Sequence, residues 1–194
     1  SDLTDSISVK KYVWEIPVCY DDSYAIDLDE YSEKISLSKN EIVSLHSNKT
    51  YYLHMYGFIP GFMYLGGLDK KLFIQRKDKP SRNILKGSVA IGGSHTGIYP
   101  SNSPGGWYVI GNSPLNFFDI EKKDSPVIVP AGDYVKFLPI SESEFKKIEV
   151  LSKEGKYTPN KTFYNDSDLK PEEELFFTLT IVPFSKFNTT NFKN

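Results

Sequence analysis

The chain has one cysteine and no long apolar run, and each scarcity excludes a class of protein. With Cys19 alone among 194 residues, an intramolecular disulfide is impossible and the thiol favours a reducing compartment. Cys19 follows Val18 in an apolar stretch, which predicts a buried structural thiol rather than a nucleophile. No segment approaches the ~18 apolar residues of a membrane span, and residues 1–11 lack a signal-peptide core. We therefore expect a soluble, cytoplasmic protein.

Charge of one sign and the familiar catalytic motifs are also lacking. The formal net charge is -2, which gives no field to attract nucleic acid or an anionic membrane, so any anion must be recognised locally. The sequence contains no Walker loop, HExxH, paired CxxC, GxSxG or Rossmann fingerprint. Three histidines and one cysteine argue against a transition-metal site, and we expect no metal.

Aromatic and apolar residues, by contrast, are plentiful. They make up 14% and 39% of the chain, which excludes disorder over most of its length. We expect one barrel domain over residues 12–149, a linker or tag remnant at 1–11, and a C-terminal extension at 150–194 that packs on the barrel and has no assigned role.

The local patterns predict a mainly β protein with two or three short packing helices. Capping pairs at Asp27/Glu30, Ser38/Glu41 and Ser141/Glu144 mark three helix starts, the last helix covering about 142–149. Short strands are predicted at 12–20, 51–56, 88–91, 98–99, 107–110, 127–129 and 134–138, and one more at 175–182 in the extension. Many short strands with few helices indicate a closed or nearly closed β-barrel.

Most of the thirteen glycines lie between Gly57 and Gly111, where they predict turns around a site. A Pro60-Gly61 pair fits a type II turn there. His95, inside a glycine-rich turn, could meet a ligand, and Arg76 could clamp a carboxylate or phosphate. Purely structural roles remain as alternatives. Arg76 would then lie in a solvated basic loop, and packing roles would apply to His46, His54, Phe58, Phe62, Tyr64 and Trp107, with turn-stabilising roles for Asp119 and Asp133.

Longer motifs carry a resemblance. EIPVCY, GFIPGFMYLGGL, GSVAIGGSHTGIYP, SPGGWYVIGNSP and PAGDYVKFLPI follow one another as in the family of the 5-oxoprolinase B subunit, also called KipI (kinase A inhibitor) or allophanate hydrolase subunit 1. The resemblance covers about residues 12–149. It implies a cyclophilin-like closed barrel, the C-terminal domain of that family, without the α/β domain that usually precedes it, so the chain is either a fragment or a shortened homologue.

The resemblance also implies a function and a site. The function is ATP-dependent opening of 5-oxoproline to glutamate, with ATP shared with two partners, the KipA-like C subunit and the LamB/YcsF-like A subunit. The alternative is a non-enzymatic regulator that inhibits a sensor histidine kinase; prolyl isomerisation rests on fold analogy alone. Arg76 and His95 would be catalytic, and the implied substrate-binding residues are Phe58, Pro60, Gly61, Phe62, Gly92, Gly93, Pro104, Gly105, Gly106 and Trp107.

Several residues depart from the pattern of that family. Ser81 and Asn112 stand at positions where the family usually shows arginine, and His95 stands where glutamine is common. Gln75, Leu85 and Lys86 replace two prolines and a small residue. Losing two guanidiniums would remove charge-assisted hydrogen bonds worth roughly 1.5 to 3 kcal/mol each, so we expect the fold to persist around an altered pocket in which Arg76 is the retained arginine.

Overall fold

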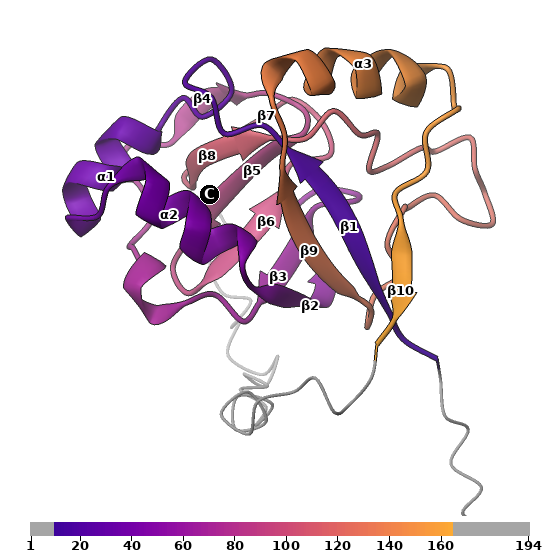
Figure 1. Ribbon diagram of the computed structural model, residues 1–194, viewed down its shortest axis with the longest axis horizontal. Helices are drawn as coiled ribbons and strands as arrows, with labels where there is room; N and C mark the ends of the chain where they lie inside the picture. Colours follow the sequence, from indigo (N-terminus) through magenta and orange to yellow (C-terminus); the bar gives the residue numbers. More distant parts are fainter. Residues whose placement is uncertain (1–9, 165–194) are drawn as a thin grey trace, which may run out of the picture. The chain divides into compact units, whose positions relative to one another are not determined.

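A computed structural model describes residues 10–164 and shows a long curved sheet flanked by three helices (Figure 1). The helices are α1 (Leu28–Ile35), α2 (Lys39–Ser47) and α3 (Glu142–Lys153), with a 3₁₀ turn η1 (Lys70–Leu72). The strands are β1 (Tyr12–Val18), β2 (Thr50–Tyr56), β3 (Met63–Gly66), β4 (Ser81–Ile84), β5 (Ser88–Gly92), β6 (His95–Ile98), β7 (Ser103–Gly105), β8 (Tyr108–Asn112), β9 (Tyr134–Pro139) and β10 (Lys161–Phe163). None of the helices in this part of the chain could cross a membrane, the longest having twelve residues.

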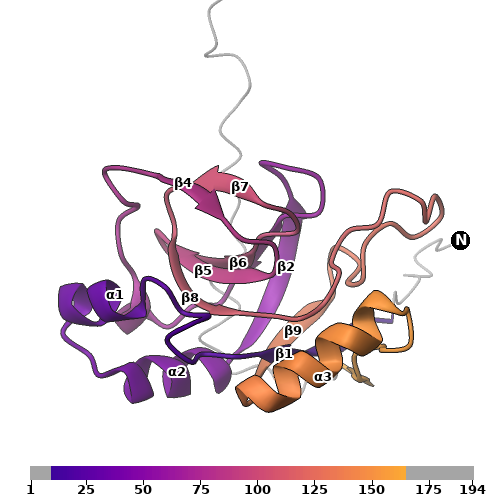
Figure 2. The ribbon, with the colours of Figure 1, turned by 90° about the horizontal axis from the view of Figure 1, so that it is seen from above.

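Two sheets make up the β structure. The larger has eight strands in the order β10-β1-β9-β2-β3-β6-β5-β8, and β4 pairs with β7 alone. Figure 2 shows the β4–β7 pair as a short second layer over β5 and β6. Between these layers lies a small apolar cluster formed by Phe62, Ile84, Ala90, Tyr99, Trp107 and Val109. The glycine-rich segment therefore belongs to the two-layered end of the molecule.

The prediction of a closed barrel is wrong, whereas a mainly β fold with short helices is confirmed. One edge of β1 pairs in parallel with β9 from Val13 to Val18, and its other edge pairs with β10 at Tyr12 to Trp14. The strand that would close the barrel, β8, meets this region only through a single bridge between Cys19 and Asn112. Strand β10 covers this edge of β1 only at Tyr12 to Trp14, and the isolated bridge at Cys19 does not extend into a ladder with β8, so the sheet stays open.

Two of the three predicted helix-capping boxes form in the structure. The capping boxes at Ser38 and Ser141 form as predicted, each serine accepting from the backbone of the glutamate three residues on. The predicted box at Asp27 is wrong, because the Asp27 side chain caps nothing and instead accepts from the backbone of Val109 at 2.8 Å. Helix α3 also runs to Lys153, beyond the predicted end at 149.

Some predicted strands are misplaced or absent. Residues 127–129 form no strand and contribute one bridge, from Val127 to Phe118. Strand β8 covers 108–112 rather than 107–110, and β6 covers 95–98 rather than 98–99. The strand predicted at 175–182 lies outside the described residues. Strands β3, β4, β7 and β10 were not anticipated, because they are only three or four residues long and show little alternation.

Two acidic residues have structural roles, but only Asp119 takes the turn-stabilising role predicted for both. Asp119 accepts from the backbone of Glu121 at 3.1 Å, which is the turn-stabilising role. Asp133 is buried and instead joins β1 to the turn before β9, accepting from the Tyr12 backbone at 3.1 Å and from the Trp14 indole at 2.8 Å. Both carboxylates are thus engaged in the scaffold.

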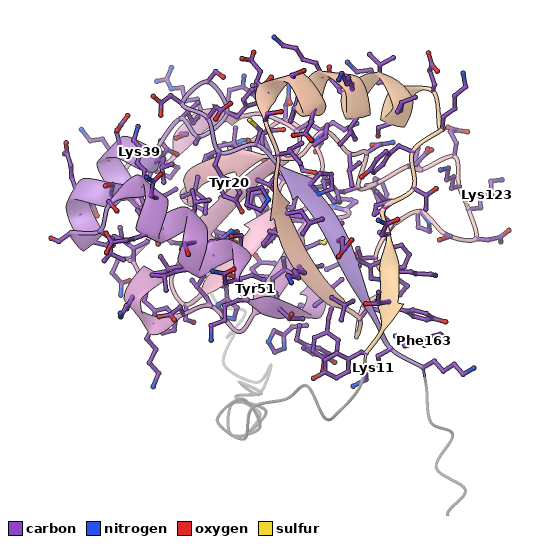
Figure 3. All side chains as sticks on the ribbon, in the orientation of Figure 1. Lys11, Tyr20, Lys39, Tyr51, Lys123 and Phe163 are labelled. Carbon is purple, nitrogen blue, oxygen red and sulfur yellow. The ribbon has the colours of Figure 1, made fainter. Side chains whose placement is uncertain are left out.

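A buried polar chain crosses the core beside α2. His46 is fully buried and stacks on Phe137, with 4.5 Å between ring centroids. Its Nδ1 lies 2.8 Å from the Tyr20 hydroxyl and its Nε2 lies 2.9 Å from Thr96 Oγ1, which donates to the carbonyl of Ala90. The hydroxyl proton of Thr96 is used in that hydrogen bond, so Thr96 Oγ1 can only accept from His46. Nε2–H of His46 therefore donates to Thr96, and the Tyr20 hydroxyl donates to Nδ1. Tyr20 and Tyr51 mark this part of the core in Figure 3.

We expect this histidine to make the fold acid-sensitive. Burial lowers the pKa of His46 to about 3, whereas an unfolded histidine titrates near ~6.5. Between these two pKa values the unfolded chain binds a proton and the folded chain does not. The free energy of unfolding is therefore highest above pH ~6.5 and falls as the pH drops, by about 2 kcal/mol at pH ~5. Urea unfolding across this range measures the loss. A His46→Gln variant with the same pH slope as the parent chain would contradict this assignment.

The only cysteine behaves as predicted. Cys19 is fully buried at the end of β1, and its backbone forms the two hydrogen bonds of the bridge to Asn112. Burial raises the pKa of its thiol to about 11, so the reactive thiolate is not populated near neutral pH. Cys19 is therefore a packing residue.

Candidate functional site

Trp107 organises the candidate site, because it lies across the glycines of the β5–β6 hairpin. A Cβ added at Gly92 would lie 2.6 Å from the indole Cγ, and one added at Gly97 would lie 3.0 Å from its Cζ3. The indole also makes perpendicular contacts with Phe62 and Tyr64, at centroid distances of 5.3 and 5.7 Å. Glycine at both positions is thus what lets the indole settle on the sheet.

This packing predicts a clear effect of Gly92→Ala. The added methyl overlaps a ring that Phe62 and Tyr64 hold from other sides, so we expect a loss of roughly 1 to 3 kcal/mol in unfolding free energy, the usual cost of overpacking. Denaturant unfolding and near-ultraviolet circular dichroism measure the two consequences, stability and indole displacement. Gly106→Ala is the matched control, since its nearest contact would be an ordinary 3.7 Å; equal losses in both variants would contradict this account of the indole.

Arg76 is held over the indole by a loop fixed at two points. Ile74 exchanges backbone hydrogen bonds with Gly93, at 2.7 and 3.2 Å, and the Lys77 backbone donates to the carbonyl of Gly106 at 2.8 Å. Between these anchors the guanidinium carbon of Arg76 lies 5.8 Å from the centroid of Trp107, within the range of a cation–π contact. Arg76 is exposed, so its donors remain available to an anion.

The next residue, Lys77, turns inward and secures the loop. Its ammonium lies 2.6 Å from Asp27 Oδ1, with the two side chains only 10% and 12% exposed. It also donates to the Ser81 hydroxyl at 3.0 Å and lies 5.3 Å from the ring centroid of Tyr108. The second carboxylate oxygen of Asp27 accepts from Val109. This ion pair explains why Asp27 does not cap α1, and it ties the Arg76 loop to the helix layer.

His95 stands at the edge of this arrangement. It is partly buried, and its Nδ1 lies 3.3 Å from the Ser94 hydroxyl. Burial lowers the pKa of His95, and the nearby His54 and Arg76 lower it further. A neutral imidazole near pH 7 can either donate or accept a hydrogen bond. Arg76 and His95 thus offer a fixed cation and a neutral acid–base group on one side of the molecule.

The predicted turn at Pro60-Gly61 is confirmed, and it positions Phe58 and Phe62 beside Trp107. Phe62 donates its backbone N–H to Ile59 at 3.0 Å, and Gly61 has a φ of 83°, as a type II turn requires. Phe62 is buried and packs on Trp107. Phe58 is 61% exposed at a φ of 65° and makes a perpendicular contact with Phe62 at 5.7 Å. A bulky residue at positive φ is strained, and such strain concentrates at functional sites.

The glycines and Pro104 have different surroundings in this region. Gly92 lies under Trp107, whereas Gly93 has open space beside it, and its N–H already donates to Ile74. Gly105 lies against the Tyr99 hydroxyl, and exposed Pro104 precedes it on β7. Gly106 contacts the Arg76 loop. The structure therefore gathers Arg76, His95, Trp107, Gly92 and Gly93, while the phenylalanines and β7 surround them as supports.

The two positions at which the sequence departs from arginine are engaged in the scaffold. Asn112 is buried and donates to the carbonyl of Lys86 at 3.0 Å. Ser81 accepts from Lys77. Sequence reasoning missed Lys77, because one lysine in a run of charged residues carries no distinguishing signal. It also set His54 aside, although Gly66, a glycine in the interior of the β region, was a clue to a side chain lying across β3.

Other concave regions of the described residues lie away from this site. A cavity of about 230 Å³ is lined by Lys10, Lys11, Lys161 and Asp133 among others. A larger one of about 940 Å³ lies between α3 and the segment from Asn112 to Ile128. No group of three or more metal-ligating His, Cys, Asp or Glu side chains occurs within residues 10–164.

Curated relatives are similar to this chain in sequence. The chain is 40% identical over 145 residues to the B subunit of 5-oxoprolinase from Bacillus subtilis (strain 168), covering 75% of this chain and 60% of that protein. It is 41% identical over 128 residues to the B subunit of 5-oxoprolinase from Escherichia coli O157:H7, covering 66% and 58%. The chain thus spans about 60% of the length of these curated relatives.

Solved structures agree with this similarity. A conserved uncharacterised protein of Pyrococcus horikoshii superposes with a TM-score of 0.65 at 43% identity, over 69% of this chain and 61% of that one. The urea amidolyase of Kluyveromyces lactis gives a TM-score of 0.71 at 20% identity, over 80% of this chain and 11% of that one, which shows a shared fold.

The family model named "Carboxyltransferase domain, subdomain C and D" matches residues 1–129. Because this match covers most of the chain, the protein belongs to the family of carboxyltransferase domains, subdomains C and D.

Proposed function

We propose that this chain serves as the B subunit of a 5-oxoprolinase, which opens 5-oxoproline to glutamate in an ATP-dependent reaction together with KipA-like and LamB/YcsF-like partners. One observation carries the proposal to this chain: the exposed Arg76 guanidinium lies 5.8 Å from the Trp107 ring centroid, beside His95. The similarity to two B subunits of 5-oxoprolinases supports it. Substrate and partners are those that the resemblance implies.

The substrate has two features that this site can recognise. Its carboxylate would pair with the Arg76 guanidinium, whose planar donors match two carboxylate oxygens. Its lactam would then lie near His95, which can exchange a hydrogen bond with the amide in its neutral form. Gly93 allows close approach, since nothing lies within 4 Å of the position of its missing Cβ. The exposed Phe58 would shield the ring from water, and the buried Phe62 would support Trp107.

Ring opening needs a water molecule and free energy. Water adds its oxygen to the lactam carbon, the carbon–nitrogen bond breaks, and the nitrogen takes up a proton. ATP supplies the driving force when the partners are present. Lys77 is committed to Asp27, which leaves Arg76 as the cation at the centre of the site, a charge suited to one carboxylate rather than a triphosphate. We therefore assign binding and orientation of 5-oxoproline to this chain and the larger share of ATP binding to its partners.

Reconstitution tests the proposal. The purified KipA-like and LamB/YcsF-like partners are assayed for ATP-dependent glutamate formation from 5-oxoproline, with and without this chain. We expect the chain to stimulate the reaction above the level of the partners alone. Absence of stimulation, with all three proteins folded and mixed at equal concentration, would count against the proposed role.

A further inference from the structure

Two histidines lie together although a strand runs between them. His54 belongs to β2 and His95 to β6, and β3 separates these strands in the sheet. Strands two places apart are about 10 Å from each other. The centroids of the two imidazole rings are nevertheless only 6.3 Å apart, with the rings steeply inclined at 72°. The side chains must therefore lean toward each other across β3.

A bulge and a glycine make this contact possible. The register between β2 and β3 shifts between Leu53 and Met55, which leaves His54 as the extra residue, and a bulge re-aims the side chain that it displaces. Gly66, the partner of Tyr52 in this ladder, ends β3 without a side chain. A Cβ at Gly66 would overlap the Nε2 atom of His54. The imidazole therefore lies over Gly66, with its Nε2 edge on β3.

The two rings differ in their surroundings. His54 is exposed and makes a perpendicular contact with Tyr52 at 5.0 Å. His95 is partly buried beside Ser94 and feels the positive charge of Arg76. Burial lowers the pKa of both histidines, and His54 further lowers the pKa of His95. Two positive imidazoles at this distance would repel each other, and Arg76 adds to the cost for His95.

We propose that His54 is a positioning residue of the site, which lies across Gly66 as the outer member of a two-histidine unit and sets the protonation of His95. The inner ring is kept neutral while the outer ring exchanges protons with solvent. The role in the reaction rests on the proposed function of Arg76 and His95, whereas the pairing is a property of this chain alone. Sequence reasoning assigned His54 a packing role.

Proton titration by NMR tests the pairing without any assay. The chain has three histidines, and His46, buried and neutral, serves as an internal reference. We expect His54→Gln to raise the titration midpoint of His95 by about half a pH unit, as for like charges ~6 Å apart under water-like screening. His95→Gln should leave the midpoint of His54 nearly in place, because His95 is neutral while His54 titrates. Met55→Gln, the exposed neighbour on β2, is the control and leaves both midpoints in place. A His95 midpoint that does not move in His54→Gln would overturn the proposal.

Gly66→Ala tests the geometry with both histidines retained. The new methyl displaces the His54 ring, so the midpoint of His95 rises as in His54→Gln; an unmoved midpoint in a folded protein would overturn the role of Gly66. In the reconstituted 5-oxoprolinase, the acid limb of kcat/KM follows the midpoint of His95 upward in His54→Gln. An acid limb that stays in place while the midpoint moves would overturn the catalytic role of the pair and leave the pairing intact.

Discussion

Arg76→Ala should lower kcat/KM for 5-oxoproline by about 10- to 150-fold in the reconstituted complex, mainly through KM. The range corresponds to the roughly 1.5 to 3 kcal/mol of a charge-assisted hydrogen bond. The guanidinium is exposed, and its anchors on the loop are backbone hydrogen bonds that the substitution keeps. The loss should therefore fall on carboxylate binding rather than on folding. Initial rates over a range of 5-oxoproline concentrations separate KM from kcat.

Two companion variants sharpen this result. Arg76→Lys keeps the charge but not the planar pair of donors, so we expect it to recover only part of the loss. Arg82→Ala removes an exposed arginine from β4 in the neighbouring segment and should leave KM within twofold, roughly the effect of a distant surface charge. If Arg82→Ala and Arg76→Ala raised KM equally, binding would depend on the general charge of this surface rather than on Arg76.

Asp27→Ala should destabilise the fold by about 3 kcal/mol, because it leaves the Lys77 ammonium buried without its partner. Both side chains of this pair are about nine-tenths buried, and the same substitution removes the acceptor for the Val109 backbone. We expect the Arg76 loop to loosen as well, since Lys77 ties it to the start of α1. Urea unfolding measures the stability, and hydrogen exchange at residues 74–80 measures the loop.

An exposed pair in the same region is the control. Lys39 and Asp29 are as close, at 2.7 Å, but are 34% and 76% exposed, so Asp29→Ala should cost less than about 1 kcal/mol. A double variant, Asp27→Ala with Lys77→Met, removes both charges and should recover part of the stability. If Asp27→Ala cost no more than Asp29→Ala, the interior ion pair would not be what fixes the loop.

Sequence reasoning succeeded where the signal was local. The Pro60-Gly61 turn and the boxes at Ser38 and Ser141 depend on residues within a few positions of each other. The glycine density also marked the segment that packs around Trp107, since glycines under an indole and in tight turns leave a compositional trace. The glycine-rich turn and the basic loop singled out His95 and Arg76, and the structure places Arg76 over Trp107 and near His95; their roles in a site stay a prediction.

Apart from the short strands, the failures involve long-range competition. Asp27 had a capping partner three residues away, but a desolvated ion pair and the Val109 backbone took its carboxylate. Closure of the barrel depended on whether β8 would form a ladder with β1, but it makes only the bridge at Cys19, and β10 reached part of that edge from the far end of the described chain. His54 looked like one residue of an alternating strand, and only the bulge and Gly66 turn it toward His95. None of these outcomes has a local pattern.

The most direct test of the site is NMR of a complex in which only this chain carries ¹⁵N-labelled tryptophan. The chain has two tryptophans; Trp107 lies under Arg76, whereas Trp14 donates its indole N–H to Asp133 elsewhere in the sheet. We predict that 5-oxoproline shifts the Trp107 indole signal and leaves that of Trp14 in place, because a carboxylate on Arg76 changes the charge over the Trp107 ring. A Trp107 signal that stays fixed while the complex forms glutamate would contradict the account.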